Sequence, residues 1–495
     1  MTGLMLLLWS APSLAADWPV WGRDATRNMA ATDEVVPTHF DPGQFTEDGE
    51  TVDLSTTEGV KWVAKLGSQT YGNPTLVDGV LYVGTNNDQQ LRPGLGGDRS
   101  VVRAIDAETG EMTWQLTIPK LGSGKVNDWE YLGICSSPAV VGDLVYVVTN
   151  RGEVVALDTK GLTNGNQGLQ DEGAYMAGPG KPPVELLPQD ADIVWRYDMI
   201  TDLGVFPHNV TSSSVLAVDD RLYVTTSNGA DWSHRNIPSP FSPTLIVLDR
   251  ATGALLGEEM AGIAEATLHA NWSSPAWAPD AGRVIFGAGD GFLYGFTPDL
   301  VMEDGLPVIT AAWKVDGNKA SYREVDGQPV KYATYKGPSE YIGTPVVVDN
   351  VAYAAIGQDP EHGPGVGRLT AVHVDSGETV WTNDGVHRSI STVAIAQGLV
   401  FAADYDGRLH AIDQKTGRTR WTHETGAHIW GSPVVLGKHV YLGDEDGVLT
   451  VLKVSKKKKL VSTIDLPSPI YSTPIAVDGT LYVPTMTHLY AVDGQ

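Results

Sequence analysis

The chain has 495 residues, of which 42% are hydrophobic, and a net charge of −26. This length accommodates two or three ordinary domains or one large repeat fold with a substantial core. The acidity argues against nucleic acid and anionic membrane surfaces as partners, because both are bound by basic patches.

The first 16 residues have the pattern of an export signal. Leu4–Trp9 is a short apolar core, and small residues surround Ala15 and Ala16. This core is too short to span a bilayer, and no later segment has the required apolar length, so we expect no membrane span. Cys135 is the only cysteine, so no cysteine follows the signal to carry a lipid. We therefore expect a signal peptide over residues 1–16 and a periplasmic or secreted protein.

Repeats organise the rest of the chain. Val101–Trp114, Leu369–Trp381 and Leu409–Trp421 each combine an alternating strand, a Thr-Gly or Ser-Gly turn and a second strand that reaches a tryptophan. A second frame precedes each copy, with a small residue and proline, a turn and a tyrosine-containing strand, as in Gly72–Gly84. The anchors of the first strands are Pro74, Pro138, Ser214, Pro275, Pro345, Val393, Pro433 and Pro474.

These anchors define eight units of four short strands, which predict an all-β fold. A single unit cannot bury its own faces, whereas a closed ring can, so we expect an eight-bladed β-propeller over residues 59–495. The last repeat stops before its outer strand, and Gly59–Gly67 supplies one, with Trp62 in the tryptophan position. We expect this N-terminal strand to close the ring in the C-terminal blade. Residues 17–58 would form an N-terminal arm packed on the outside.

The repeats resemble the PQQ-like β-propeller repeat family, a branch of the quinoprotein alcohol dehydrogenase-like superfamily. The resemblance rests on the motif Ala-x-Asp-x-x-x-Gly-x-x-x-Trp and covers residues 59–495. The best copies are Ala104, Asp106, Gly110 and Trp114, and then Ala411, Asp413, Gly417 and Trp421. The resemblance implies that the tryptophan packs between blades and that the glycine makes the turn. It is specific for fold rather than for function.

The family contains two functional classes that this sequence matches poorly. Quinoprotein dehydrogenases typically carry a vicinal cysteine pair over their PQQ cofactor, which a single cysteine cannot provide. Their Glu, Asn and Asp set for calcium has no counterpart by motif in this chain, so PQQ is a less favoured cofactor than a divalent metal. The outer-membrane assembly factor is usually a lipoprotein, and this chain has no cysteine for a lipid.

Histidines recur before the inner strands. His208, His269 and His387 stand six residues before an anchor, and His428 stands five residues before one. Equal offsets in a pseudosymmetric ring place side chains at equal depth, so we expect them at the channel mouth. His234 and His362 lie in the insertions 227–242 and 357–368, which open on the same face. Imidazole is the common ligand of zinc, copper, iron and manganese. The predicted metal ligands are His208, His269, His362 and His428.

Aromatic and charged residues accompany the histidines. Aromatic side chains three or four residues before their anchors would form a collar suited to a sugar or another ring-shaped ligand. The catalytic candidates are His208, His269, His387, Arg388, Tyr341 and Glu340. The ligand-binding candidates are Trp272, Trp430, Asp231, His234, Asp359 and Glu361. Alternatively, each histidine hydrogen-bonds backbone between blades and each aromatic ring packs there.

Three functions follow from this pattern. The first is an exported enzyme, a lyase or hydrolase with or without a metal, that acts on a small-molecule or carbohydrate ligand at the channel mouth. The second is a divergent quinoprotein oxidoreductase. The third is a cell-envelope scaffold that binds protein partners, as the outer-membrane assembly factor does.

Overall fold

The structure is a computed structural model that describes residues 17–494, so the predicted signal peptide lies outside the described residues. Strands dominate this part of the chain, and its α-helices are all short. They are α1 (Glu172–Ala177), α2 (Met199–Leu203), α3 (Ile263–Ala266) and α4 (Ala320–Arg323). No helix between residues 17 and 494 is long and apolar enough to cross a membrane.

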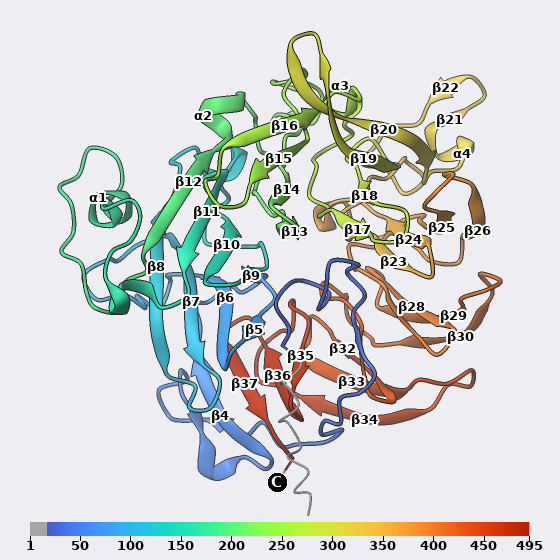
Figure 1. Cartoon of the computed structure of the whole chain (residues 1–495). Helices are drawn as coiled ribbons and strands as arrows, with labels where there is room; N and C mark the ends of the chain where they lie inside the picture. The colour runs from blue at the N-terminus through green and yellow to red at the C-terminus, as the bar shows by residue number, and fades with distance from the viewer. Residues whose placement is uncertain (1–16, 495) are drawn as a thin grey trace, which may run out of the picture.

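The strands form successive antiparallel units, each running from a three-residue inner strand to an outer strand (Figure 1). The first unit is β5 (Thr75–Val77), β6 (Val80–Asn86), β7 (Arg99–Asp106) and β8 (Met112–Pro119). The second is β9 (Ala139–Val141), β10 (Leu144–Val148), β11 (Glu153–Asp158) and β12 (Ile193–Asp198). The third is β13 (Leu216–Val218), β14 (Arg221–Thr225), β15 (Leu245–Asp249) and β16 (Leu255–Glu259). The fourth is β17 (Ala276–Ala278), β18 (Arg283–Gly287), β19 (Phe292–Glu303) and β20 (Leu306–Asp316). Parallel pairing of β16 with β20 joins the third and fourth units into one sheet.

The second half of the chain repeats this arrangement. The fifth unit is β23 (Val346–Val348), β24 (Val351–Ile356), β25 (Arg368–His373) and β26 (Thr379–Asn383). The sixth is β27 (Ala394–Ala396), β28 (Leu399–Asp404), β29 (Arg408–Asp413) and β30 (Thr419–Glu424). The seventh is β31 (Val434–Leu436), β32 (His439–Gly443), β33 (Val448–Lys453) and β34 (Leu460–Asp465). The last is β35 (Ile475–Val477), β36 (Thr480–Pro484), β37 (His488–Val492) and β4 (Val60–Lys65). Short pairs outside these units are β2 (Gln44–Phe45) with β3 (Val52–Asp53), and β21 (Glu324–Val325) with β22 (Gln328–Pro329).

The two ends of the chain meet in one sheet. Strand β4 pairs antiparallel with β37, with Trp62 opposite Ala491, as expected for Gly59–Gly67. The units lie around a common centre in Figure 1, which gives the molecule a propeller-like shape. Strand β4 supplies the outer strand that the last repeat lacks, so this sheet also has four strands.

In five of the units the tryptophan of the repeat motif joins its unit to the next. The Trp62 indole N–H donates to the Ala107 carbonyl at 3.0 Å, and its ring covers Gly110. Gly110 has a φ of +74°, and a Cβ there would lie 2.6 Å from the indole. The same indole-to-carbonyl bond recurs at Trp114, Trp313, Trp381 and Trp421. The glycine is therefore required both by the turn and by the ring that lies over it.

The first part of the predicted N-terminal arm does not lie on the outside as expected, whereas residues 41–58 are mostly exposed or half-buried. Residues 17–35, which we call the belt, run past the inner strands (dark blue in Figure 1). Trp18 exchanges hydrogen bonds with Leu76 of β5, and β1 (Ala30–Ala31) pairs in parallel with β31. Trp277 of β17 and Val347 of β23 donate to belt carbonyls at 2.8 and 2.9 Å. Inner strands are sheet edges with unpaired backbone groups, and the belt satisfies them, which is why it is drawn inward.

Candidate functional site

A ring of polar side chains surrounds the centre of the molecule. Its members occupy the position two residues before each inner strand, and a backbone N–H of one unit donates to the side chain of the next over 2.6–3.3 Å. We call it the polar ring; it consists of Asn73, Ser137, Ser214, Ser274, Thr344, Thr392, Ser432 and Thr473. The bond from Thr473 to Asn73 links the last unit to the first. The serine and threonine hydroxyls donate to no protein acceptor within residues 17–494, so their protons are available to a ligand.

The polar ring lines the inner chamber of a central cavity, with a volume of about 190 Å³. An outer chamber of about 340 Å³ opens beside it and shares several walls with it, including Tyr71, Trp272 and Trp430. Trp21 of the belt also lines the inner chamber. Neither chamber is lined by a lysine or arginine from the described part of the chain, whereas Asp359 and Glu361 line the outer one. The predicted ligand-binding residues Trp272, Trp430, Asp359 and Glu361 therefore share one cavity.

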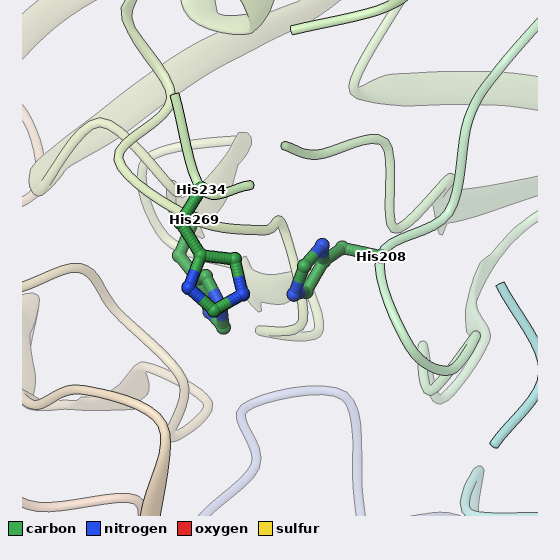
Figure 2. Close-up of side chains that lie close together, drawn as sticks. All are labelled: His208, His234 and His269. Atoms are coloured by element: carbon green, nitrogen blue, oxygen red, sulfur yellow. The ribbon is translucent and has the colours of Figure 1, made fainter. Parts of the chain in front are cut away.

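Three histidines converge in the structure (Figure 2). Trp272, which lines both chambers, packs against one of them, so they lie beside the cavity. His208 precedes β13, His234 lies between β14 and β15, and His269 precedes β17, so adjacent units supply all three. Their ring centroids lie 4.2 Å apart for His208 and His269, 4.7 Å for His234 and His269, and 5.0 Å for His208 and His234. One nitrogen from each lies within 4.8 Å of the others. The ring of His362, from the β24–β25 loop, lies 5.4 Å from that of His269.

Hydrogen bonding leaves most of these nitrogens unpaired. His208 Nδ1 lies 2.6 Å from the Ala230 carbonyl oxygen and must donate to it, so its buried Nε2 carries the free lone pair. Both nitrogens of His269 and Nδ1 of His362 are buried without a hydrogen-bond partner among the described residues. Burial lowers the pKa of His208 to about 3 and the pKa values of His269 and His362 to about 4. These imidazoles are therefore neutral near pH 7.

A buried carboxyl group stands behind His269. Glu340 Oε1 lies 3.6 Å from His269 Nδ1 and accepts a hydrogen bond of 2.9 Å from the Tyr332 hydroxyl. Burial raises the pKa of Glu340 well above its usual value. The Tyr332 ring stacks on His269 with planes 28° apart. Sequence reasoning missed Tyr332 because it lies outside the repeat frame; the long connection between β20 and β23 was the available signal.

Two predicted histidines lie outside the cluster. His387 Nδ1 pairs with Asp406 at 2.6 Å, and His428 stacks flat on Tyr405 with ring centroids 4.3 Å apart. Each ring is turned toward the loop between the second and third strands of the sixth unit. The third anchor is also corrected, because Val215, not Ser214, directly precedes the inner strand β13. His208 therefore stands seven residues before its anchor, and equal offset does not explain the cluster.

Three other candidates have structural contacts instead of facing the cavity. The Tyr341 ring is fully buried in a hydrophobic cluster and packs on Gly287, because its position falls between the fourth and fifth units. The Arg388 guanidinium is also buried and donates to the carbonyls of His362, Gly363 and Thr334, so it holds loops rather than a substrate carboxylate. Asp231 is half-buried and accepts hydrogen bonds from Ser233 and Asn236 in the turn that carries His234.

A set of repeated four-stranded units around a central cavity defines a β-propeller-like protein. The chain belongs to the family described as outer membrane protein assembly factor BamB, whose model matches residues 8–174, 99–294 and 365–495. BamB of Escherichia coli is 27% identical over 128 residues, which are 24% of this chain and 32% of that protein. A 1-butanol dehydrogenase (cytochrome c) of Thauera butanivorans is 32% identical over 118 residues, 20% of this chain and 16% of that enzyme. The chain therefore matches about a third or less of the length of these curated relatives.

Solved structures of both kinds share the fold. BamB from Moraxella catarrhalis has a TM-score of 0.52 at 17% identity and covers 84% of this chain and 99% of its own. A quinohemoprotein alcohol dehydrogenase from Comamonas testosteroni has a TM-score of 0.60 at 12% identity, covering 97% and 81%. A europium-containing methanol dehydrogenase has a TM-score of 0.57 at 13% identity, covering 94% and 89%. At these identities the likeness concerns the fold alone.

Proposed function

We propose that the units are the eight blades of a closed propeller and that the protein is an exported enzyme acting on a small, neutral, hydroxylated ring such as a carbohydrate. The observation that carries this proposal is the chemistry of the cavity, where aromatic walls stand above hydroxyls whose protons are free. The seven hydrogen bonds of the polar ring, including the one from Thr473 to Asn73, support closure by eight blades. Export rests on the apolar segment within residues 1–16.

The cavity walls suit the faces of a sugar ring. Trp430 and Tyr471 stack with centroids 4.7 Å apart, and Tyr71 contacts both rings. Trp272 lines the same two chambers. Aromatic faces bind the C–H faces of a ring, while hydroxyl donors bind its oxygens. The cavity therefore favours a ligand that is apolar on its faces and polar at its edge.

The same walls do not fit PQQ, the cofactor of the dehydrogenase relatives of this fold. PQQ carries carboxylate groups, and such groups are bound by arginine or lysine. The described lining offers neither, and Asp359 and Glu361 would repel the cofactor. Cys135 lines both chambers but has no second cysteine beside it. The site therefore supports a neutral ligand better than a quinone cofactor.

A second candidate is a scaffold that binds proteins in the cell envelope. The family match favours it, and so do two exposed aromatic side chains on the β14–β15 loop, Trp232 (53% exposed) and Phe241 (87% exposed). Large exposed aromatic groups are enriched where proteins bind each other. A scaffold needs this outer surface rather than the cavity, so the two functions respond to different substitutions.

Titration of the purified protein with neutral mono- and oligosaccharides tests the proposal, with tryptophan fluorescence and calorimetry as readouts. We expect saturable binding that Trp430→Ala weakens at least about tenfold, because each lost aromatic contact is worth about 1 kcal/mol or more. Phe241→Ala is the matched control and should bind normally. Absence of binding to any neutral sugar, or equal loss in both variants, would reject the cavity as a carbohydrate site.

A further inference from the structure

We propose that His208, His234 and His269 bind one divalent transition-metal ion through three imidazole nitrogens, with a coordination position left open. Three protein ligands with one open position are the arrangement of catalytic rather than structural metal sites. Two of the three rings are buried within the propeller, so the cluster is not a surface to which a nucleic acid, a membrane or another protein could bind.

The spacing of the nitrogens is close to what a metal requires. Zinc–nitrogen bonds of about 2.0–2.1 Å at tetrahedral angles place two ligand nitrogens about 3.4 Å apart. The three candidate nitrogens lie within 4.8 Å of one another, so they must close by little more than 1 Å. His234 lies on an exposed loop with a φ of +54°, and this loop can supply the movement. The buried rings of His208 and His269 lie just before the inner strands of the third and fourth units and need to move least.

The unpaired nitrogens give the second, independent argument. Protein interiors rarely leave an imidazole without any partner, since buried polar groups are normally hydrogen-bonded. His269 is 1% exposed, and neither of its nitrogens has a partner among the described residues. His208 Nε2 is buried and unpaired in the same way. A metal ion between the rings would satisfy His208 Nε2 and one nitrogen of His269 at once.

The contacts behind the rings are those that orient metal ligands. The Ala230 carbonyl fixes His208 with its proton on Nδ1, which directs Nε2 toward the cluster. The Glu340 carboxyl oxygen lies 3.6 Å from His269 Nδ1 and, on a slightly closer approach, would accept a hydrogen bond from the Nδ1–H, which leaves Nε2 for the metal. Tyr332 holds Glu340 through its hydroxyl and covers the face of His269.

The metal would stand beside the proposed ligand cavity. Trp272 lines both chambers, and its ring meets that of His269 edge to face at 5.1 Å. Asn209, next to His208, and Asp359 line the outer chamber. This part of the inference rests on the proposed function: a hydroxyl or carbonyl oxygen of the bound sugar, or a water, would occupy the open position. A metal there acts as a Lewis acid or activates the bound water.

The test uses the untagged full-length chain, stripped with a chelator and titrated with Zn²⁺ against a competing fluorescent chelator. We expect one tightly bound ion per chain by elemental analysis. His208→Gln and His269→Gln should each lower the affinity at least 100-fold. His387→Gln and His428→Gln, which alter the two predicted histidines that lie outside the cluster, should leave it unchanged.

His234→Gln guards against misfolding, because this exposed side chain is not part of the core and its loss should still lower the affinity. Trp430→Ala separates the two proposals, since it should weaken sugar binding at least about tenfold and leave zinc binding intact. The metal site is refuted if the native chain takes up no stoichiometric Zn²⁺, Mn²⁺ or Cu²⁺. It is also refuted if the control variants lose as much affinity as the cluster variants.

Discussion

The Arg27 guanidinium donates a hydrogen bond of 2.9 Å to the carbonyl oxygen of Pro275, 248 residues further along the chain. The same side chain donates to the carbonyls of Trp21, Ser214 and Val215 and is fully buried. One residue of the belt thus ties the third and fourth units to the centre of the propeller. The belt is therefore part of the structural core, not an appendage.

Replacement of Arg27 by methionine should destabilise the protein by about 3–5 kcal/mol, because it leaves several buried carbonyls without donors. Lysine should recover only part of this loss, since it lacks the planar fork that reaches all of them. Arg23→Met in the same belt is the control. Arg23 pairs with an Asp33 side chain that is 66% exposed, so its loss should cost at most about 1 kcal/mol. Urea unfolding of the three variants measures the differences, and equal costs for Arg27 and Arg23 would remove the belt from the core.

The glycine of the repeat motif offers a matched pair of substitutions. Gly110 and Gly79 have nearly the same positive φ, +74° and +76°, but only Gly110 lies under Trp62; nothing stands within 4 Å of a Cβ at Gly79. Gly79→Ala should cost about 1–2 kcal/mol from backbone strain alone. Gly110→Ala should cost at least about 2 kcal/mol more, because the indole must move. Thermal or urea unfolding tests this, and similar costs at both positions would show that the tryptophan contact is dispensable.

Asp231 positions the turn that carries His234, and substitutions can separate this role from any effect of its negative charge. Its carboxylate caps the turn that carries His234, and its hydrogen bonds lower its pKa to about 2. Asp231→Ala should therefore weaken zinc binding about tenfold or more by loosening the turn. Asp231→Asn keeps an acceptor oxygen and should restore most of the affinity. If Asn and Ala behave alike, the turn is not what presents His234.

The buried side chain of Asp290 should make the free energy of unfolding depend on pH. Burial raises its pKa from 3.8 to about 6, although the Tyr294 hydroxyl donates to it at 2.6 Å. The folded state holds the proton more tightly than the unfolded state, so this contribution is complete below about pH 4 and is lost as the pH rises through 6. The loss amounts to about 3 kcal/mol. The free energy of unfolding of Asp290→Asn should therefore fall less than that of the native chain between pH 4 and 7, and parallel curves would contradict the assignment.

The strand frame could be predicted from sequence because its signals are local. A proline before the inner strand and a glycine under the tryptophan mark most units, and the missing outer strand of the last repeat pointed directly to Gly59–Gly67. The third unit escaped this frame: its segment around Ser214 and Val215 has no proline, which displaced the anchor by one residue. The belt has no periodic pattern, since it meets the inner strands through its backbone and through single side chains such as Arg27 and Asn28, not through one repeating face.

The candidate site was predictable only in part. We expected His208 and His269 to lie close together, and their rings do so in the structure. They meet because they belong to neighbouring units, not because they stand at equal distances from their anchors. His387 and His428 have similar offsets and different directions, because Asp406 and Tyr405 hold their rings. Side-chain direction depends on contacts between distant loops, which spacing along the chain cannot give. For the same reason the burial of Tyr341 and Arg388 appears only in three dimensions.

X-ray absorption spectroscopy at the zinc edge of the metal-loaded native chain can decide whether His208, His234 and His269 bind one metal ion, because the spectrum reports the ligands themselves. We expect three imidazole nitrogens at about 2.0–2.1 Å from the zinc ion, with an oxygen in the remaining position. His269→Gln should remove one imidazole from the spectrum, while His428→Gln should remove none. A zinc ion surrounded by oxygen alone, or by fewer than two imidazoles, would contradict the proposed metal site.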